Sequence, residues 1–434
     1  MKAISNIYPT SKNNWKVPFF TIWGGQAFSL LGSQLVGFAL IWYLTDLTGS
    51  ATVLTIAAMM EWLPRVFIGP LAGTLVDRWN RRYVMLAADF LTAAATSMII
   101  FLGWAGTLEI WHIYALMLLR SLGGSFHMPA MMASTSLMVP EEQLARIQGL
   151  NQLLQGAMNI IAPPLGALLI EVLPLHGVLS VDIGTAALAI LPLLFFHIPQ
   201  PYERGAKPSK ESSVWREMRD GMAYVWGWTG LRKVLILAVV INMISMPAFV
   251  LVPLLVKNEF GGGAMEIASM QSAWSVGFLL GGLLLSTWGG FRRKMTTVTL
   301  AMFGSAAGML IVGVAPGTVF MLAVGGFLIA GLMNVLINGP AFALLQTIVD
   351  ADMQGRVLAL VISLANAMTP IGLAFAGPMA EFTGVRTCFI LTSVVFVLSG
   401  CFVLINSDVR NIEDSRNEPA QARQTISPAV ETLS

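Results

Sequence analysis

The stretch GTLVDRWNRR at residues 73–82 joins two apolar runs, at about 51–76 and 83–105, and holds three arginines beside one aspartate. Each run is as long as the about 20 residues of helix that cross the roughly 30 Å hydrocarbon core of a bilayer. Over the whole chain the mean hydropathy is +0.73, with 56% apolar and 11% charged residues. A soluble domain carries about 25% charged residues. The sequence therefore predicts an all-α membrane protein.

Outward from residues 73–82, long apolar runs alternate with short polar gaps along the whole chain. A longer polar segment that begins at Pro199 divides the runs six and six. Twelve transmembrane helices are predicted, at about 17–45, 51–76, 83–105, 111–138, 147–172, 177–198, 232–257, 267–289, 295–314, 317–348, 357–381 and 385–406. The expected parts are an N-terminal six-helix bundle (1–198), a cytoplasmic linker (199–231), a C-terminal six-helix bundle (232–406) and a cytoplasmic tail (407–434).

The placing of lysine and arginine predicts which side of the membrane each gap faces. With the N-terminus inside, the cytoplasmic gaps hold 21 Lys and Arg residues, whereas the outer gaps hold Lys257 and Arg386. Cytoplasmic loops carry such an excess of cations, so both termini are expected in the cytoplasm. The first run lacks the short apolar core and the small-residue cleavage site of a signal peptide, and we expect it to stay as the first span.

The fourth and tenth runs end on similar sequences. Each has Pro-Ala, an apolar stretch, a valine, and then a glutamine before an arginine, at 129–146 and at 340–356. A repeat at the same place in each half indicates two bundles of like topology. Transporters of this kind place their binding site near the membrane midplane, between the halves.

Residues 73–82 resemble the signature loop of the major facilitator superfamily, with Asn80 where the familiar pattern has glycine. Stretches at 14–26, 126–130 and 137–144 resemble the drug-exporting branch that includes macrolide-efflux proteins and siderophore exporters. The similarity runs from about residue 14 to 406. The resemblance implies the major facilitator fold, in which two six-helix bundles rock to expose a cavity to one side and then to the other.

The resemblance implies that Asp77 latches a gate by packing near the start of the eleventh run. A carboxylate beside a helix N-terminus gains roughly 0.3–1 kcal/mol from the helix dipole. Gly73 would let the two helices approach closely. The arginines of the loop either share in the gate or only hold this loop in the cytoplasm; they are Arg78, Arg81 and Arg82.

Charges inside the predicted spans are candidates for proton coupling, because each costs roughly 2.5–3.5 kcal/mol at mid-helix. Glu61 and Arg65 lie four residues apart on one helix face, where Glu61 would carry the proton or the two charges would only neutralise each other. Arg120 lies in a stretch that resembles the fourth-helix motif linked to proton transfer. A buried arginine also needs an anionic or carbonyl partner.

The fifth run resembles the motif that marks antiporters, although Ala162 stands where glycine is usual. Its residues are Gly156, Pro163, Pro164 and Gly166. Small residues and prolines let a membrane helix bend and slide against its neighbour, so a kinked packing helix is the alternative. Asp89 and Asp182 lie within a turn or two of the predicted membrane edges, where we expect structural roles with access to interfacial water.

Polar and soft apolar side chains recur on the spans that the resemblance assigns to the cavity. Methionine and aromatic side chains form adaptable surfaces for apolar ligands, and His127 can titrate near neutrality. The predicted substrate-cavity residues are Gln26, Gln34, His127, Gln155, Asn159, Asn242, Met246, Phe249, Asn334 and Asn338.

These observations together predict a proton-coupled secondary exporter of a hydrophobic or amphiphilic compound, which the resemblance implies to be a macrolide. A glycine-rich phosphate-binding loop does not occur, so ATP-driven pumping would need a partner subunit. We expect a transporter and not an enzyme. The alternatives are an exporter of siderophores or other metabolites, a channel, a lipid scramblase or a membrane sensor. We expect a monomer in the cell membrane that works with its substrate, protons and lipid, without nucleic acid, metal or cofactor.

Overall fold

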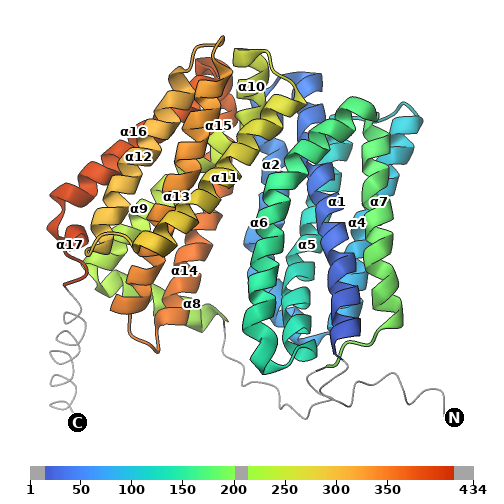
Figure 1. The fold of residues 1–434 in the computed structure, drawn as a ribbon, viewed down its shortest axis with the longest axis horizontal. Coiled ribbons are helices and arrows are strands. Elements are labelled where there is room, and N and C mark those ends of the chain that lie inside the picture. Colours follow the sequence, from blue (N-terminus) through green and yellow to red (C-terminus); the bar gives the residue numbers. More distant parts are fainter. Residues whose placement is uncertain (1–14, 201–213, 415–434) are drawn as a thin grey trace. The chain divides into compact units, whose positions relative to one another are not determined.

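The computed structural model describes residues 15–200 and 214–414, and all regular elements in these residues are helices (Figure 1). Parts of the predicted linker and tail lie outside the described residues. The helices are α1 (Lys16–Thr48), α2 (Ala51–Phe67), α3 (Gly69–Arg78), α4 (Arg81–Trp104), α5 (Ile110–Met138), α6 (Glu141–Val172), α7 (Leu175–Phe195), α8 (Val214–Gly227), α9 (Thr229–Val250), α10 (Val252–Phe260), α11 (Ala264–Trp288), α12 (Lys294–Val314), α13 (Phe320–Ile348), α14 (Gln354–Ala367), α15 (Thr369–Thr383), α16 (Val385–Ile405) and α17 (Ser407–Arg410).

The predicted all-α membrane fold is confirmed, and each predicted span coincides with one helix or with two consecutive helices. Among the described residues, 10 helices are long and apolar enough to cross a membrane, or up to 11 if the bent pair α2–α3 counts as one span. α5 is not among them, because Arg120, two histidines and several serines and glycines lower its hydropathy. A total of twelve spans stays a prediction.

Three of the predicted spans are broken into two helices, and proline accounts for each break. α3, α10 and α15 each begin with a proline in their first two positions. Proline has no N–H to donate to the preceding turn, so it is favoured at the start of a helix and ends the one before it. The axes of α2 and α3 differ by 56° in direction.

The predicted similarity between the fourth and tenth runs appears as two helices of equal length. α5 and α13 both contain 29 residues, each has a proline inside, and each ends at a valine in extended conformation, Val139 or Val349. The shared sequence therefore ends both helices in the same way.

The helices form two compact units. The first holds the described residues up to 200 together with 250–272, and the second holds 214–249 and 273–414. In the first unit α1 packs along α7, and α4 lies against α5 and α7. α1 and α7 come close because Gly32 has no side chain; a Cβ there would overlap Thr185 Oγ1. α10 contacts α1, and Lys257 Nζ pairs with Asp46 Oδ1 at 2.9 Å.

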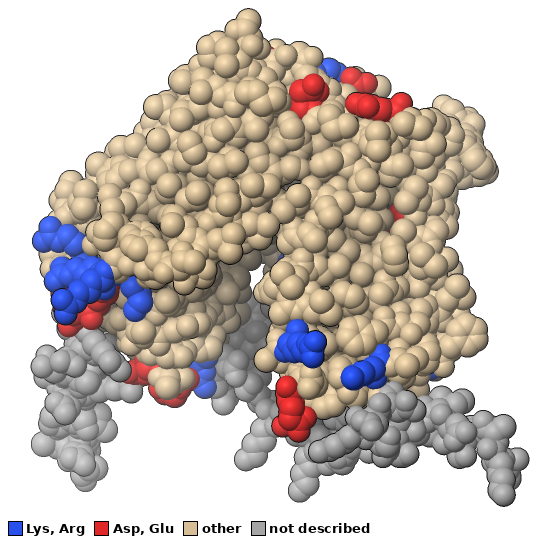
Figure 2. Space-filling model, viewed as in Figure 1, with Lys and Arg blue, Asp and Glu red and all other residues tan. Residues whose placement is uncertain are grey.

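In the second unit α12 packs against α13 and α16, and α8 against α14. The surface of both units is rich in exposed large apolar side chains, Phe101 and Phe375 among them. Figure 2 shows that charged side chains occupy little of the visible surface. So extensive an apolar exterior belongs in lipid rather than in water.

A cavity and two buried charge clusters

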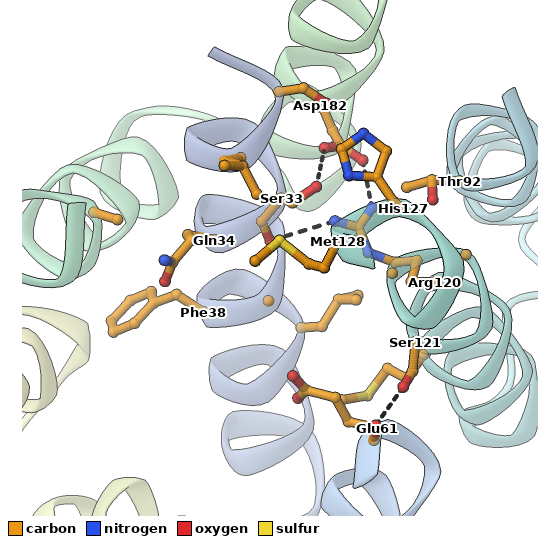
Figure 3. A pocket seen from close by; sticks show the side chains of 18 of the residues that line it. Ser33, Gln34, Phe38, Glu61, Thr92, Arg120, Ser121, His127, Met128 and Asp182 are labelled. Atoms are coloured by element: carbon orange, nitrogen blue, oxygen red, sulfur yellow. Dashed lines mark hydrogen bonds and ion pairs between the residues drawn. The ribbon is translucent and has the colours of Figure 1, made fainter. Parts of the chain in front are cut away.

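Residues of the first unit line a partly open cavity of about 770 Å³ (Figure 3). Residues of α1 to α7 line it, together with Pro253, Ile267 and Gln271. Several predicted site residues come together in its wall: Gln26, Gln34, Glu61, Arg65, Arg120, His127, Gln155 and Pro163. Asn159 lies beside them, and its Oδ1 accepts hydrogen bonds from Gln34 at 3.4 Å and Gln155 at 3.1 Å.

Glu61 and Arg65 form the predicted ion pair at the cavity wall. Arg65 Nη2 lies 2.8 Å from Glu61 Oε1, and the two side chains are 49% and 41% exposed, arginine first. The Arg65 guanidinium also lies 5.8 Å from the ring centroid of Trp62. Figure 3 shows Glu61 close to Ser121 of α5, whose hydroxyl donates to the Glu61 backbone carbonyl. The pairing is confirmed, and the pair is accessible rather than buried.

Arg120 has the anionic partner that a buried arginine requires, and that partner is Asp182 of α7. Arg120 Nη1 donates to Asp182 Oδ2 and, at 3.0 Å, to Thr96 Oγ1 of α4. Arg120 Nη2 donates to the Ser33 carbonyl of α1 at 3.3 Å. Asp182 Oδ1 and Oδ2 also accept from the hydroxyls of Ser33 at 3.4 Å and Thr96 at 3.0 Å. We name these four residues the arginine clamp, because they tie four helices together.

The expectation that Asp182 reaches interfacial water is wrong, since the residue is 1% exposed. Asp182 lies near the sequence start of α7, but α1, α4 and α5 cover it. Nearness to a helix end along the sequence does not show what neighbouring helices bury.

A second buried cluster joins Gln26, Asp89 and His127, which come from α1, α4 and α5. Gln26 Nε2 donates to Asp89 Oδ2 at 3.1 Å, and His127 Nε2 lies 2.8 Å from Gln26 Oε1 and 3.4 Å from Asp89 Oδ1. All three are buried, Gln26 completely. The expected access of Asp89 to interfacial water is therefore wrong as well, and His127 is hydrogen-bonded. We name this set the histidine cluster.

The loop between α3 and α4 shows why Asn80 can stand in place of glycine. Asn80 has an extended backbone, and its Oδ1 accepts from the Arg82 N–H at 3.1 Å, which caps α4. Asparagine is among the best residues at this capping position. Arg82 donates to the carbonyls of Leu193 and, at 2.8 Å, Leu194 at the end of α7, where the helix dipole favours a cation.

Asp77, Gly73 and Arg78 of the same sequence stretch have different surroundings. Asp77 is 75% exposed at its side chain and lies 3.5 Å from the buried Arg81. A Cβ at Gly73 would meet no atom within 4 Å, and the expected approach to the helix of the eleventh run stays a prediction. Arg78 borders a separate apolar groove between α4 and α5.

A profile of the Major Facilitator Superfamily matches residues 22–366 and 234–433, which together cover most of the chain. The chain belongs to the Major Facilitator Superfamily. Membership agrees with the 10 candidate spans of the described residues and makes this a multi-pass transporter of the cell membrane. An enzyme is thus not indicated.

The chain is homologous to efflux proteins of this superfamily. It is 33% identical to macrolide efflux protein A of Streptococcus pyogenes over 92% of this chain and 98% of that protein. It is 25% identical to the multidrug efflux pump Tap of Mycobacterium tuberculosis over 93% and 96% of the two chains. The nucleoside transporter NupG (D323A mutant) superposes with a TM-score of 0.68 at 14% identity, covering 89% and 98%. That last likeness concerns the fold.

The antiporter-type stretch of this superfamily member lies in an unbroken helix. α6 continues through Pro163 and Pro164, and Pro163 borders the cavity. A Cβ at Gly166 would lie 2.9 Å from the Phe38 ring, so glycine is needed for α1 and α6 to pack. Gly156 is partly exposed on the same helix. The packing interpretation of Gly166 is therefore supported.

The remaining predicted cavity residues belong to the second unit, and their contacts within that unit are as follows. Asn242 Nδ2 donates to the Ala238 carbonyl at 2.9 Å. Asn338 Nδ2 donates to the carbonyl and the side chain of Asn334 at 3.0 and 3.2 Å. Phe249 packs edge-on against Trp274, with 4.3 Å between ring centroids, and Met246 is half-buried on the same helix α9.

Proposed function

We propose that this protein is a secondary exporter of hydrophobic or amphiphilic compounds, and that protons entering the cell drive it. The cavity of the first unit carries the proposal, because its volume of about 770 Å³ falls in the roughly 300–1,000 Å³ range of sites for drug-sized ligands. Its wall combines apolar side chains with many polar and charged ones, Glu61 and Arg65 among them. The likeness to macrolide efflux protein A makes a macrolide the first substrate to test.

In this proposal the chain crosses the membrane twelve times with both termini in the cytoplasm, and two six-helix bundles alternate between inward and outward access. Predicted bundle limits are 1–198 and 232–406. The strong excess of cations in alternate gaps supports the orientation. A compound bound from one side is then released to the other.

Glu61, Arg65 and Arg120 are the residues that we predicted for coupling. Glu61 stands at the cavity wall with its charge balanced by Arg65 at 2.8 Å, so proton binding there would release Arg65 to another partner. Arg120 is held by Asp182. We therefore assign the accessible pair to contact with substrate and proton, and Arg120 to the position of the helices around the cavity.

Everted membrane vesicles from cells with and without the gene test the proposal. With radiolabelled erythromycin as probe and an acidic vesicle interior, we expect accumulation only in vesicles that contain the protein, and its loss on addition of a protonophore. Movement of the probe without any gradient would indicate a channel or scramblase instead. Measuring the susceptibility of cells with and without the gene to chemically different drugs then shows which other compounds are substrates.

The gate assignment has its own test in the same vesicles. Asp77→Asn removes the charge of an exposed carboxylate and keeps its shape, so we expect normal membrane expression without transport. Glu171→Gln, a neutralisation at an exposed site of α6, is the matched control. Full transport by Asp77→Asn would end the gate assignment.

A further inference from the structure

The carboxylate of the histidine cluster, Asp89, has a different kind of partner from the other buried acid of the described residues. Those residues contain two buried carboxylates, Asp89 and Asp182. Asp182 pairs with Arg120, whereas the charged or titratable partner of Asp89 is His127. Arginine keeps its charge at any physiological pH, but histidine gains and loses a proton near neutrality. The acid of the histidine cluster therefore has a titratable partner, whereas the acid of the arginine clamp has a permanent cation.

The hydrogen bonds show how the cluster holds a proton. His127 Nε2 faces two oxygens, Gln26 Oε1 at 2.8 Å and Asp89 Oδ1 at 3.4 Å, so this nitrogen carries a hydrogen. Gln26 accepts from His127 and donates to Asp89, which fixes the orientation of its amide. With a neutral imidazole and an ionised Asp89, the three residues carry a net charge of −1. One added proton, on His127 or on Asp89, makes the cluster neutral.

Among the described residues, no lysine or arginine forms an ion pair with Asp89. α1 has no charged residue between Lys16 and Asp46. α5 presents His127 and Arg120, α7 presents Asp182, and Arg120 is bound by Asp182. Three arginines lie near the end of α3 and the start of α4. Arg81 pairs with Asp77, and Arg82 donates to carbonyls at the end of α7. Arg78 is the third. A buried unpaired charge is costly in a membrane protein, so a proton is the counter-charge available to this cluster.

The two clusters form parallel layers, one above the other. Gln26 and Ser33 on α1, Asp89 and Thr96 on α4, and Arg120 and His127 on α5 are each seven residues apart. Seven residues are about two helical turns, or roughly 10 Å. Residues of both layers border the same cavity, and Figure 3 shows His127, Arg120 and Asp182 beside it.

We propose that Gln26, Asp89 and His127 form an occluded proton-binding site beside the cavity, and that its proton is exchanged during the transport cycle. The site rests on the proposed function and is additional to Glu61. The proton moves from water in the cavity to the Asp89 carboxylate or to the His127 imidazole, and it returns to water when that side of the site opens. No covalent bond other than O–H or N–H changes. Gln26 is a positioning residue that holds both groups in place.

Proton binding is tested first without any substrate, on the purified full-length protein in lipid. Infrared difference spectra between acidic and basic buffer record protonated carboxyl groups and imidazole. We expect a carboxyl or imidazole signal in the wild type and in Glu171→Gln that Asp89→Asn loses. An unchanged spectrum in Asp89→Asn would overturn the site. Should Asp89→Asn fail to fold, His127→Gln keeps a side-chain N–H donor, and an unchanged pH midpoint in that variant would overturn it equally.

Coupling is tested next in vesicles with radiolabelled erythromycin. Asp89→Asn should still exchange internal for external erythromycin, because the amide keeps the size of the side chain that borders the cavity, but an imposed proton gradient should no longer produce accumulation. Gradient-driven accumulation at the wild-type level would overturn the coupling role. Absence of transport by the wild type would count against the proposed substrate, and the infrared measurement would still decide whether the proton site exists.

Discussion

The arginine clamp and the histidine cluster lie two helical turns apart on the same three helices, yet they stabilise a buried carboxylate in opposite ways. Asp182 receives a permanent cation and two hydroxyl donors. Asp89 receives an amide and an imidazole. A permanent ion pair favours one arrangement of helices, whereas a titratable pair lets the charge of the layer follow the proton concentration. The comparison teaches that burial alone does not decide the role of an acid; its partner does.

The largest expected effect comes from breaking the arginine clamp. Asp182→Ala leaves the buried Arg120 charge without its anion, which costs about 3–5 kcal/mol. We expect a large fall in thermal stability, measured by size-exclusion chromatography of heated, detergent-solubilised protein. The double variant Asp182→Ala/Arg120→Met removes both charges and should recover much of the loss. Equal stability of Asp182→Ala and wild type would show that the clamp carries little energy.

The close approach of α1 and α7 beside the clamp gives the next largest effect. Gly32→Ala places a Cβ against Thr185 Oγ1 and near Asp182 Oδ1, and such overpacking costs about 1–3 kcal/mol. Gly24→Ala is the matched control, because a Cβ there meets nothing within 4 Å. Thermal stability of the two variants should diverge, with Gly32→Ala lower. If both match the wild type, the helices are not held at this spacing.

The exposed pair Glu61–Arg65 at the cavity wall should behave differently from the buried pair of the arginine clamp. Glu61 and Arg65 are each more than a third exposed, and such pairs contribute about 0–1 kcal/mol. Glu61→Gln should therefore leave the melting temperature almost unchanged while transport falls. A stability loss as large as that of Asp182→Ala would show that the pair is buried during most of the cycle.

The smallest effect is expected at the surface pair of Lys233 and Asp408, whose side chains are 27% and 47% exposed and whose Nζ and Oδ2 lie 2.6 Å apart. The hydrogen bond from Lys233 and its charge lower the pKa of Asp408 from 3.8. A carboxylate with a lowered pKa stabilises the fold above its unfolded pKa, and this contribution disappears as the pH falls through the folded value. A Lys233–Asp408 double-mutant cycle should thus show weak coupling at neutral pH and none in strong acid.

Much of this arrangement could be predicted from the sequence, because the relevant signals are local. Each run predicted from hydropathy coincides with one helix or two consecutive helices, and four-residue spacing paired Glu61 with Arg65. The seven-residue spacing of polar residues on α1, α4 and α5 was also present in the sequence, and it would have indicated the two layers had it been followed across runs. Asp89 and Asp182 were misjudged because position along a helix does not report what other helices cover.

The sequence by itself determined an all-helical membrane protein and a strong asymmetry of cations between alternate gaps. These follow from hydropathy, backbone chemistry and charge, which act over one or two turns. Only the tertiary structure decided that Asp182 meets Arg120 and that Asp89 meets His127, since these contacts join residues 62 apart for the first pair and from separate helices for the second. Which helix faces come together is set by packing, as at Gly32, and packing therefore gives one buried acid a fixed charge partner and the other a titratable one.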